Sequence, residues 1–351
     1  MSADIPSVRE TGATERARFE AEIVPAGEPV ALRGQVSGWP LCALAGDSDE
    51  AFCTYLTARA NDRPAQLWAG PSGMRGRYGW SAGLSGENFE RKMAPLATIC
   101  ELLLRSTREA DAPAMFAGAV NLDEHAPDLL PDLAIPLLDS ARHRLTSLWI
   151  GNPGRTAAHW DLPDNLSCVV RGERHYLLFP PEQVGNLYVG PIDRTLAGQP
   201  TSMVDCENPD FERFPRYREA LAHAREAVLQ PGDALFIPSM WFHQVISTAP
   251  LGAQVNFWWR ENDAETLSPQ STLLHAFLTL RDLPERERKA WRAFFDHYVF
   301  GDPEQAAAHI PEAARSILGP IGSQEQLKLA EQLVSELVGW HNRLLGSRKD
   351  G

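Results

Sequence analysis

The chain has 351 residues and a formal net charge of -13, and its length suits one large domain or two modest ones with a substantial core. This negative charge disfavours a nucleic-acid partner, because such a surface needs clustered Lys and Arg to neutralise phosphates. The N-terminus lacks the apolar core of a signal peptide, and no uncharged apolar run approaches the ~20 residues that span a bilayer. We therefore expect a cytoplasmic protein without a membrane partner.

The five cysteines are scattered and include no C-x-x-C pair. An odd number without paired spacing predicts neither a disulfide framework nor a zinc site built from thiolates. We expect buried free thiols, which behave as small apolar side chains. These residues are Cys42, Cys53, Cys100, Cys168 and Cys206.

Residues 1–145 mix short strands and helices. The pattern predicts a strand over 29–34 and a helix over 49–61. Residues 88–106 are predicted to form a helical stretch that is interrupted at Pro95. We expect this region to supply α/β elements that pack on the strands that follow.

Residues 146–260 are rich in short aromatic and β-branched segments punctuated by Gly and Pro. Many short strands with tight turns predict an antiparallel barrel or a double-sheet jelly roll. A longer connection over residues 182–228 interrupts the strands, and the second half of its part 207–228 is predicted to be helical. The predicted strands are 145–151, 166–172, 173–181, 233–238, 241–248 and 253–260.

Residues 261–351 are predicted to be helical. Ser268 can cap a helix with Pro269 at its first helical position, and Pro284 repeats this device. The last helix carries an apolar stripe, which must be covered either by the chain's own core or by a second copy in a helical dimer. The stripe consists of Leu327, Ala330, Leu333, Val334, Leu337, Trp340 and Leu344.

His159 and Asp161 are separated by one residue in a predicted strand. Residues two apart in a strand point to the same face, so both side chains can converge on one point. By the same alternation, His243 shares a face with Trp241 and Val245 in a distant strand. Two imidazoles and a carboxylate form a facial triad that suits Fe(II) and leaves coordination positions open. Asp161 inside a barrel would be a costly unpaired charge unless a cation lay beside it.

Four separated segments carry a family resemblance, namely residues 156–188, 207–215, 231–245 and 255–259. In order and spacing they resemble the JmjC or cupin-like oxygenases that depend on Fe(II) and 2-oxoglutarate. Within that group the chain is similar to the asparaginyl hydroxylase that inhibits hypoxia-inducible factor, and to its bacterial relatives. The resemblance implies a mainly β fold, in which a double-stranded β-helix, also called a jelly roll or cupin, carries an α/β N-terminal part and a C-terminal helical bundle.

By this resemblance, His159, Asp161 and His243 are the Fe(II) ligands, and 2-oxoglutarate is the co-substrate. Thr156 falls where the family places a hydroxyl against the co-substrate carboxylate. Arg174 falls where the hydroxylase has a lysine that binds the distal carboxylate. A guanidinium can serve there as a bidentate donor, but it is larger and demands a roomier pocket.

Asn165 and Asn256 match two family asparagines near the co-substrate and the iron. The family tyrosine of the co-substrate pocket should lie near residues 114–121, where this chain offers Met115 and Phe116 and no phenol. The resemblance therefore implies either a different donor or a weaker hold on the co-substrate.

Residues 75–90 resemble the family's loop over the active-site entrance, although a surface turn also accounts for them. Trp149 and Trp241 either line the pocket or pack in the core. The aromatic and charged residues of the loop are Arg77, Tyr78 and Trp80.

We expect an oxygenase that hydroxylates a C–H bond of a protein side chain or of a small amino-acid-like substrate, with release of succinate and CO2. The alternative is a cupin that binds a metal or a small ligand without turnover, because a fold does not guarantee an activity. The helical tail is compatible with the family's C-terminal dimerisation helices, so a homodimer is the expected assembly if the apolar stripe is not covered within the chain.

Overall fold

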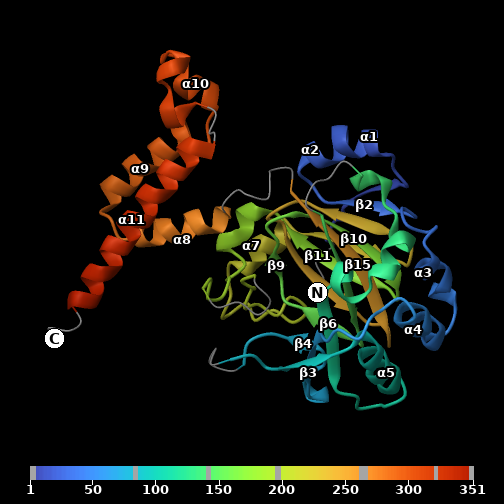
Figure 1. Ribbon diagram of the computed structural model, residues 1–351. Helices are drawn as coiled ribbons and strands as arrows, with labels where there is room; N and C mark the ends of the chain where they lie inside the picture. Colours follow the sequence, from blue (N-terminus) through green and yellow to red (C-terminus); the bar gives the residue numbers. More distant parts are fainter. Residues whose placement is uncertain are drawn as a thin grey trace. The chain divides into compact units, whose positions relative to one another are not determined.

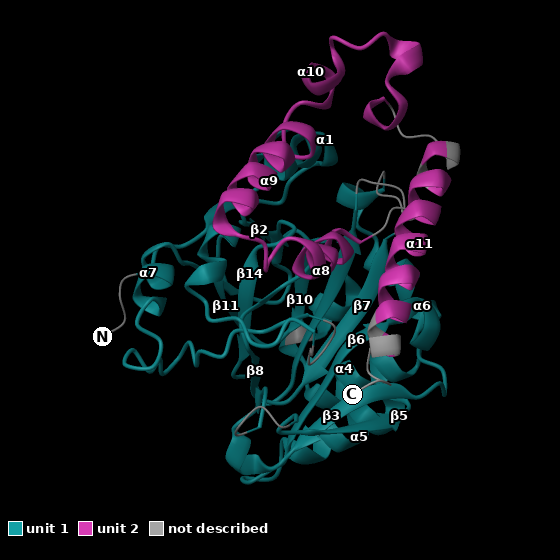
Figure 2. Ribbon diagram, turned by 90° about the vertical axis from the view of Figure 1, so that its left-hand side faces the viewer, with its two compact units in different colours: residues 1–264 teal, residues 265–351 magenta. Residues whose placement is uncertain are grey.

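In the computed structural model the chain divides into two compact units, residues 1–264 and residues 265–351 (Figure 2). The structure describes residues 5–81, 86–139, 144–193, 199–260, 268–319 and 323–347. The predicted start of the helical region at residue 261 lies outside these residues. No helix among those described is long and apolar enough to cross a membrane.

The larger sheet of the first unit has nine strands in the order β1-β2-β13-β10-β15-β7-β6-β3-β5 (Figure 1). β1 and β2 are parallel, and all other neighbours are antiparallel. The strands are β1 (Arg9–Gly12), β2 (Val30–Arg33), β3 (Ala65–Gly70), β5 (Glu90–Ala94), β6 (Ala114–Asn121), β7 (Leu145–Gly151), β10 (Asp164–Arg171), β13 (Ala234–Ile237) and β15 (Gly252–Trp259).

The smaller sheet has the order β12-β11-β14-β8-β4, and β9 pairs with β14 beside β8. Only the short β4–β8 pair is parallel. The strands are β4 (Arg77–Tyr78), β8 (Gly154–Thr156), β9 (His159–Trp160), β11 (Arg174–Phe179), β12 (Arg225–Leu229) and β14 (Phe242–Ser247).

The two sheets face each other and share an apolar cluster. Val169 and Ile237 of the larger sheet pack in this cluster with Tyr176 and Leu229 of the smaller one. Two facing sheets of mainly antiparallel strands form a jelly roll. The predicted mainly β fold with a cupin core and helical additions is therefore confirmed.

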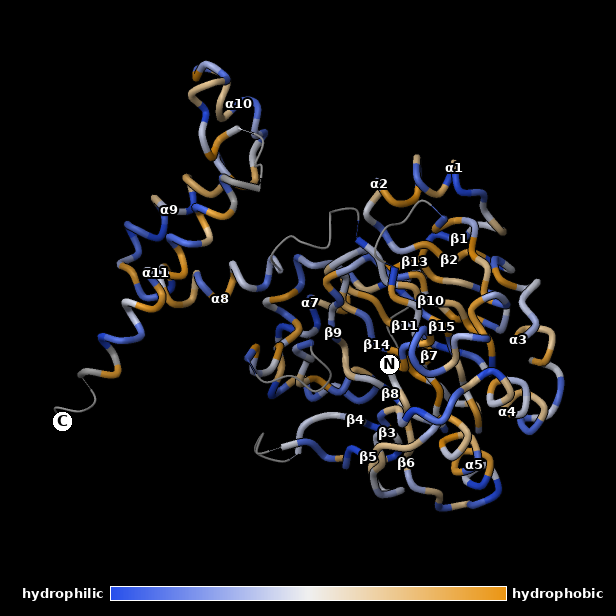
Figure 3. The backbone as a smooth tube through the Cα atoms, viewed as in Figure 1, coloured by the Kyte–Doolittle hydropathy of each residue, from blue (hydrophilic) through white to orange (hydrophobic). Residues whose placement is uncertain are grey.

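Alternation along β10 explains how one strand serves two environments. Leu166 and Cys168 point outward into the largest core cluster, and that cluster also contains Phe52 of α4. Asn165 and Ser167 point between the sheets, where polar side chains line a cavity or hydrogen-bond beside it. Figure 3 shows hydrophobic residues concentrated along the sheet strands.

The outer face of the larger sheet is covered by α3 (Pro40–Ala43), α4 (Asp49–Thr57) and α5 (Leu96–Ser106). The other helices of the first unit outside the long connection are short, namely α1 (Arg16–Arg18), α2 (Val24–Ala26) and α6 (Leu122–His125).

The prediction for residues 88–106 is wrong in its first half. Glu90–Ala94 forms the edge strand β5, and α5 begins after Pro95. The ring of a proline disfavours the helical conformation of the residue before it, so the chain stays extended up to Ala94. The register of Ala94 opposite Ala65 then extends the larger sheet.

The prediction for the second half of residues 207–228 is also partly wrong. Helix α7 covers only Tyr217–Ala222, and the chain continues as strand β12. Ala227 and Leu229 are buried at alternate positions against β11, which is the period of a strand. Pairing with a neighbouring strand therefore outweighs the helical propensity of this segment.

The second unit is helical, as predicted. Ser268 occupies the cap position of its first helix, but its side chain makes no cap hydrogen bond. Pro284 is itself the cap residue of the next helix and not its first helical residue, because it keeps extended backbone angles there. The helices are α8 (Pro269–Thr279), α9 (Glu285–Tyr298), α10 (Pro303–Ala307) and α11 (Ser323–Ser347).

The apolar stripe of α11 is not covered within the second unit. Among the side chains described there, only Ala306 and Ala307 are buried. The side chain of Leu344, a member of the stripe, lies outside the described residues. The described part of this unit thus offers no core beneath the stripe. Its exposed members are Leu327, Val334, Leu337 and Trp340.

Candidate active site

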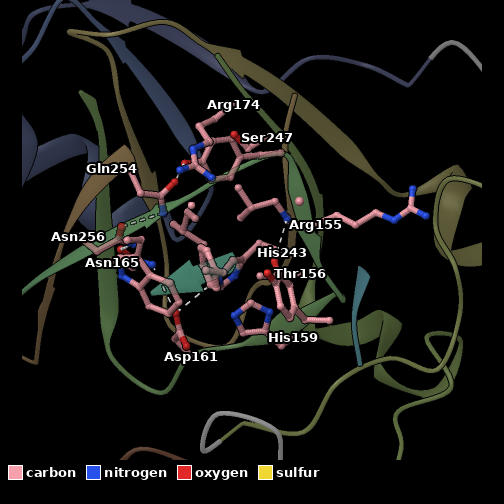
Figure 4. A pocket seen from close by; sticks show the side chains of 18 of the residues that line it. Arg155, Thr156, His159, Asp161, Asn165, Arg174, His243, Ser247, Gln254 and Asn256 are labelled. Atoms are coloured by element: carbon pink, nitrogen blue, oxygen red, sulfur yellow. Dashed lines mark hydrogen bonds and ion pairs between the residues drawn. The ribbon is translucent and has the colours of Figure 1, made fainter. Parts of the chain in front are cut away.

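The three predicted ligands meet inside the first unit (Figure 4). His159 in β9 lies opposite His243 in β14, with ring centroids 4.4 Å apart. Asp161 follows β9 directly, and its Oδ2 lies 3.5 Å from Nε2 of His243. One ligand atom from each residue lies within 4.8 Å of the others. The three side chains can therefore touch a common metal ion.

Both imidazoles are oriented by the carbonyl two residues before them. Nδ1 of His159 lies 2.9 Å from the carbonyl oxygen of Ala157, and Nδ1 of His243 lies 3.1 Å from that of Trp241. A carbonyl can only accept a hydrogen bond, so each Nδ1 carries the proton. Each Nε2 is then left with a lone pair, which is the arrangement that metal-binding histidines use.

The electrostatics of the cluster also suit a cation. Burial, and secondly the neighbouring His159, lowers the pKa of His243 to about 4, so this imidazole is neutral at neutral pH. Asp161 is 5% exposed, and no Lys or Arg forms an ion pair with it in the described part of the chain. A buried carboxylate beside the neutral imidazole of His243 lacks a counter-charge, which a divalent ion would supply. The donor set of two nitrogens and one carboxylate oxygen therefore fits Fe(II).

The two predicted asparagines lie next to the cluster. Asn165 Nδ2 donates to Oδ2 of Asp161 at 3.4 Å, and Asn256 Nδ2 donates to Oδ1 of Asn165 at 2.9 Å. Both amides are almost fully buried. These contacts help to orient the carboxylate of Asp161 through its Oδ2.

Further polar residues, which the sequence analysis missed, continue this chain of hydrogen bonds. Gln254 Nε2 donates to Oδ1 of Asn256 at 2.9 Å, and the Tyr176 hydroxyl donates to Oε1 of Gln254 at 2.9 Å. The Ser167 hydroxyl lies 2.9 Å from that of Tyr176. Ser167 and Gln254 are polar residues at inward positions of apolar strands, and this could have identified them.

Arg174 lies at the opposite end of the cavity from the three ligands (Figure 4). Its side chain is 5% exposed, yet Nε and Nη2 have no hydrogen-bond partner. Burial lowers the pKa of Arg174, but a guanidinium remains charged at neutral pH. Ser247 is also buried, and its hydroxyl, which likewise has no hydrogen-bond partner, lies beside Arg174. Unpaired buried donors of this kind indicate an anion-binding position.

Thr156 in β8 lines the same cavity, and its Oγ1 accepts a hydrogen bond from the backbone N–H of Val245 at 3.3 Å. Phe116 also lines the cavity without a hydroxyl, whereas Met115 packs into the core on the other face of β6. All the predicted site residues thus line one cavity, and their roles as ligands and anchors stay predictions.

Phenols do reach the cavity, but from other strands than the sequence analysis considered. Tyr176 comes from β11, and burial raises its pKa to about 12, so the hydroxyl stays a neutral donor. Tyr78 comes from β4, and its buried hydroxyl has no partner. Tyr78 was expected over the entrance and is instead a buried part of the cavity wall.

The two tryptophans behave differently. Trp149 lines the cavity, whereas Trp241 packs against the core between the sheets. The indole of Trp241 donates to the carbonyl oxygen of Gly27 at 2.9 Å. Trp241 is partly buried against that core and is absent from the described cavity lining.

Two ion pairs fasten the long connection beside the cavity. Arg77 Nη1 lies 2.9 Å from Oδ2 of Asp205, and Arg155 pairs with Glu207. Arg77 and Arg155 lie side by side in the parallel β4–β8 pair. Thr201 from the same connection forms an isolated antiparallel β-bridge with His159. The connection is therefore tied to the strands that carry the site.

Most of the first unit is similar in sequence to known proteins. A family model for the cupin-like domain matches residues 16–265. The chain is 38% identical over 136 residues to the lysine-specific demethylase JMJ31 of Arabidopsis thaliana, covering 38% of this chain and 24% of that protein. It is 32% identical over 179 residues to the tRNA wybutosine-synthesizing protein 5 of Gallus gallus, covering 46% of this chain and 53% of that protein.

It is also 29% identical over 225 residues to the HSPB1-associated protein 1 of Bos taurus, covering 56% of this chain and 44% of that protein. The chain thus spans between a quarter and about half of the length of these curated relatives. The family match covers every strand of the two sheets except β1, and all the cavity residues described above. The chain therefore belongs to the cupin-like domain family and has JmjC-type proteins among its relatives.

Proposed function

We propose that the protein is an Fe(II)- and 2-oxoglutarate-dependent oxygenase that hydroxylates a C–H bond and releases succinate and CO2. The observation that carries the proposal is the pairing of two features in one cavity. His159, Asp161 and His243 provide an open ligand set at one end, and Arg174 provides an unpaired cation at the other. Membership of the cupin-like domain family and the likeness to a lysine-specific demethylase support the same class.

Each group in the cavity then has a defined task. The two Nε2 atoms and the Asp161 carboxylate would hold the iron, and Arg174 would bind the distal carboxylate of the co-substrate, with the Thr156 hydroxyl nearby. Bound iron and 2-oxoglutarate together supply the oxidant for an unactivated C–H bond. The aromatic wall formed by Tyr78 and Trp149 keeps bulk water away from the reacting atoms.

The relatives act on different targets by name, since one is a lysine-specific demethylase and another a tRNA wybutosine-synthesizing protein. The net charge of -13 disfavours a tRNA substrate for this chain, because phosphate binding needs clustered cations. We infer that the substrate is a protein side chain or a small amino-acid-like molecule.

Anaerobic titration of the metal-free full chain with Fe(II) and 2-oxoglutarate tests this function. The wild type should develop the visible charge-transfer band of the iron–2-oxoglutarate chelate and should release succinate in air. Asp161→Ala should lose both signals, whereas Asp111→Ala, a change at an exposed aspartate that is not among the described lining residues of the cavity, should keep them. A non-catalytic cupin would bind the metal without releasing succinate, and that result would refute the proposal.

We also propose that a second copy of the chain covers the apolar stripe of α11. The exposed apolar residues run along a helix of 25 residues, which is about 37 Å long. The described part of the unit buries only Ala306 and Ala307, so a two-fold symmetric partner is the simplest cover. Sedimentation of the full chain should give a dimer, and Leu337→Glu should give a monomer. Glu331→Lys, at an exposed position of the same helix, is the control. A monomeric wild type at micromolar concentration would refute the dimer.

A further inference from the structure

A second chamber opens beside the predicted metal ligands. It has a volume of about 120 Å³ and shares His159, Asp161 and Thr156 with the cavity that contains Arg174. Arg174 is not among the residues that line it. The ligand cluster therefore lies where the two chambers meet. One chamber is suited to an anion, and the other needs a different occupant.

Apart from Asp161, the described walls of this chamber carry no acidic or basic side chain other than His159, and aromatic rings form a large part of them. Three indoles and a phenol line it, and Trp149 and Trp258 lie 5.9 Å apart between ring centroids. Among the described lining residues there is no Lys, no Arg and no carboxylate besides Asp161. A cation that entered would meet no carboxylate other than Asp161, and the metal ion bound there would repel it. The aromatic lining residues are Trp68, Tyr78, Trp149 and Trp258.

A bulge in β6 sets the size of the chamber. The register of β6 with β7 shifts between Ala117 and Val120, and Ala119 adopts a left-handed backbone conformation with φ of 51°. A Cβ at Gly118 would lie 2.8 Å from a ring carbon of Trp149, so this indole packs directly onto the bulge. Bulges near active sites re-aim side chains, and a left-handed backbone conformation is strained for an alanine. As a result Ala119, although exposed to solvent, is among the residues that line the chamber.

We propose that this chamber is the substrate subsite and that it takes an uncharged, mainly apolar group no larger than a benzene ring. Engineered apolar cavities of about 150 Å³ in another protein bind benzene, which sets the upper size for a chamber of this volume. Two donors in its wall lack partners, the Tyr78 hydroxyl and the Trp258 indole N–H. They can hydrogen-bond a polar atom next to the apolar group, such as the peptide carbonyl of a hydrophobic residue.

This inference rests on the proposed function and deepens it, because it names the group that reaches the metal. Hydrophobic amino-acid side chains such as those of leucine and phenylalanine meet the limits of size and charge. The side chain of lysine does not, because of its positive charge. The chamber thus specifies the chemical class of the oxidised carbon as that of an apolar side chain.

The full chain loaded with Mn(II) and 2-oxoglutarate provides a direct test. The probes are N-acetyl-leucinamide, N-acetyl-phenylalaninamide and N-acetyl-lysinamide, and NMR measures the relaxation that the paramagnetic ion induces in their side-chain protons. The two neutral probes should be relaxed about tenfold or more above the lysine probe, because an ammonium would be desolvated without a partner. Equal or stronger relaxation of the lysine probe would overturn the inference.

Variants at Ala119 localise the effect. Ala119→Leu should fill the chamber and abolish the relaxation of the neutral probes while 2-oxoglutarate protons remain relaxed, because Ala119 does not line the other chamber. Ala119→Gly relieves the left-handed strain, enlarges the chamber and should admit N-acetyl-tryptophanamide. Ala110→Leu, at an exposed position, is the matched control.

The outcomes separate the inference from the proposed function. If 2-oxoglutarate protons are not relaxed in the wild type, the proposed function fails and the subsite fails with it. If they are relaxed but the neutral probes are not, only the subsite is wrong. Unchanged probe relaxation in both Ala119→Leu and Ala119→Gly would also place the substrate elsewhere.

Discussion

Replacing Arg174 by methionine should stabilise the protein without co-substrate and abolish co-substrate binding. The guanidinium is 5% exposed, and Nε and Nη2 have no partner. A buried polar group without a hydrogen bond costs about 1–3 kcal/mol, and replacing buried charges by apolar side chains often stabilises a protein by about 1–4 kcal/mol. At about 2–4 °C per kcal/mol for a domain of this size, the melting temperature of Arg174→Met should rise by several degrees.

Binding should change in the opposite direction. Truncating one member of a buried charge pair costs about 2–5 kcal/mol, which corresponds to a roughly 30-fold to 5,000-fold weaker affinity for 2-oxoglutarate. Thermal unfolding with and without 2-oxoglutarate, in the presence of Mn(II), measures both effects in one assay. The wild type should gain stability with ligand concentration, and the variant should not.

Arg171 offers a control of the same chemistry with the opposite expected sign. Its Nε and Nη2 contact Oδ1 of Asp49, and its Nη1 donates to the carbonyl oxygen of Leu44 at 2.9 Å. Arg171→Met leaves these partners unpaired and should lower the melting temperature. If Arg174→Met destabilises the protein as Arg171→Met does, the guanidinium is satisfied in solution and the anion-site argument fails.

Three further predictions follow from single contacts. Asn256→Ala breaks the hydrogen-bond chain that ends on Asp161 and should weaken metal affinity about 10-fold to 100-fold, as measured by competition with a chelator; an unchanged affinity would deny the chain a role. Arg77→Gln removes the ion pair with Asp205 and should speed hydrogen exchange in residues 199–207, an effect that high salt should reproduce in the wild type but not increase in the variant. Gly76→Ala should lower the free energy of unfolding by about 1–3 kcal/mol, as measured by urea unfolding. Gly76 has φ of 68°, and a Cβ there would collide with the backbone around residue 153. An unchanged urea midpoint would contradict that geometry.

The alternation of side chains between the two faces of a strand was the strongest sequence signal for the fold and for the cavity. It placed the six core strands, and it put His243 on an inward face. β9, however, has only two residues, and Asp161 lies just beyond it. The separation of one residue still brings Asp161 beside His159, because the chain stays extended through this point.

Non-local pairing limited the prediction elsewhere. β5 and β12 carry sequence patterns that also suit a helix, and only the neighbouring strands β3 and β11 decide between the two. The aromatic chamber has the same origin. Trp68, Trp149 and Trp258 come from three strands that are far apart in the sequence, so no local pattern could group them.

The distribution of unpaired polar groups connects stability with function. Among the described residues, eight have buried side-chain donors or acceptors without partners, and five of them line the cavity, namely Tyr78, Arg155, Arg174, Ser247 and Trp258. Each such group destabilises the empty fold, because its hydrogen bonds to water are lost and not replaced. The apolar contacts between the sheets and beneath the outer helices must offset this cost. A ligand that meets these groups recovers the lost hydrogen bonds as binding energy, so the same residues that weaken the empty protein specify what it binds.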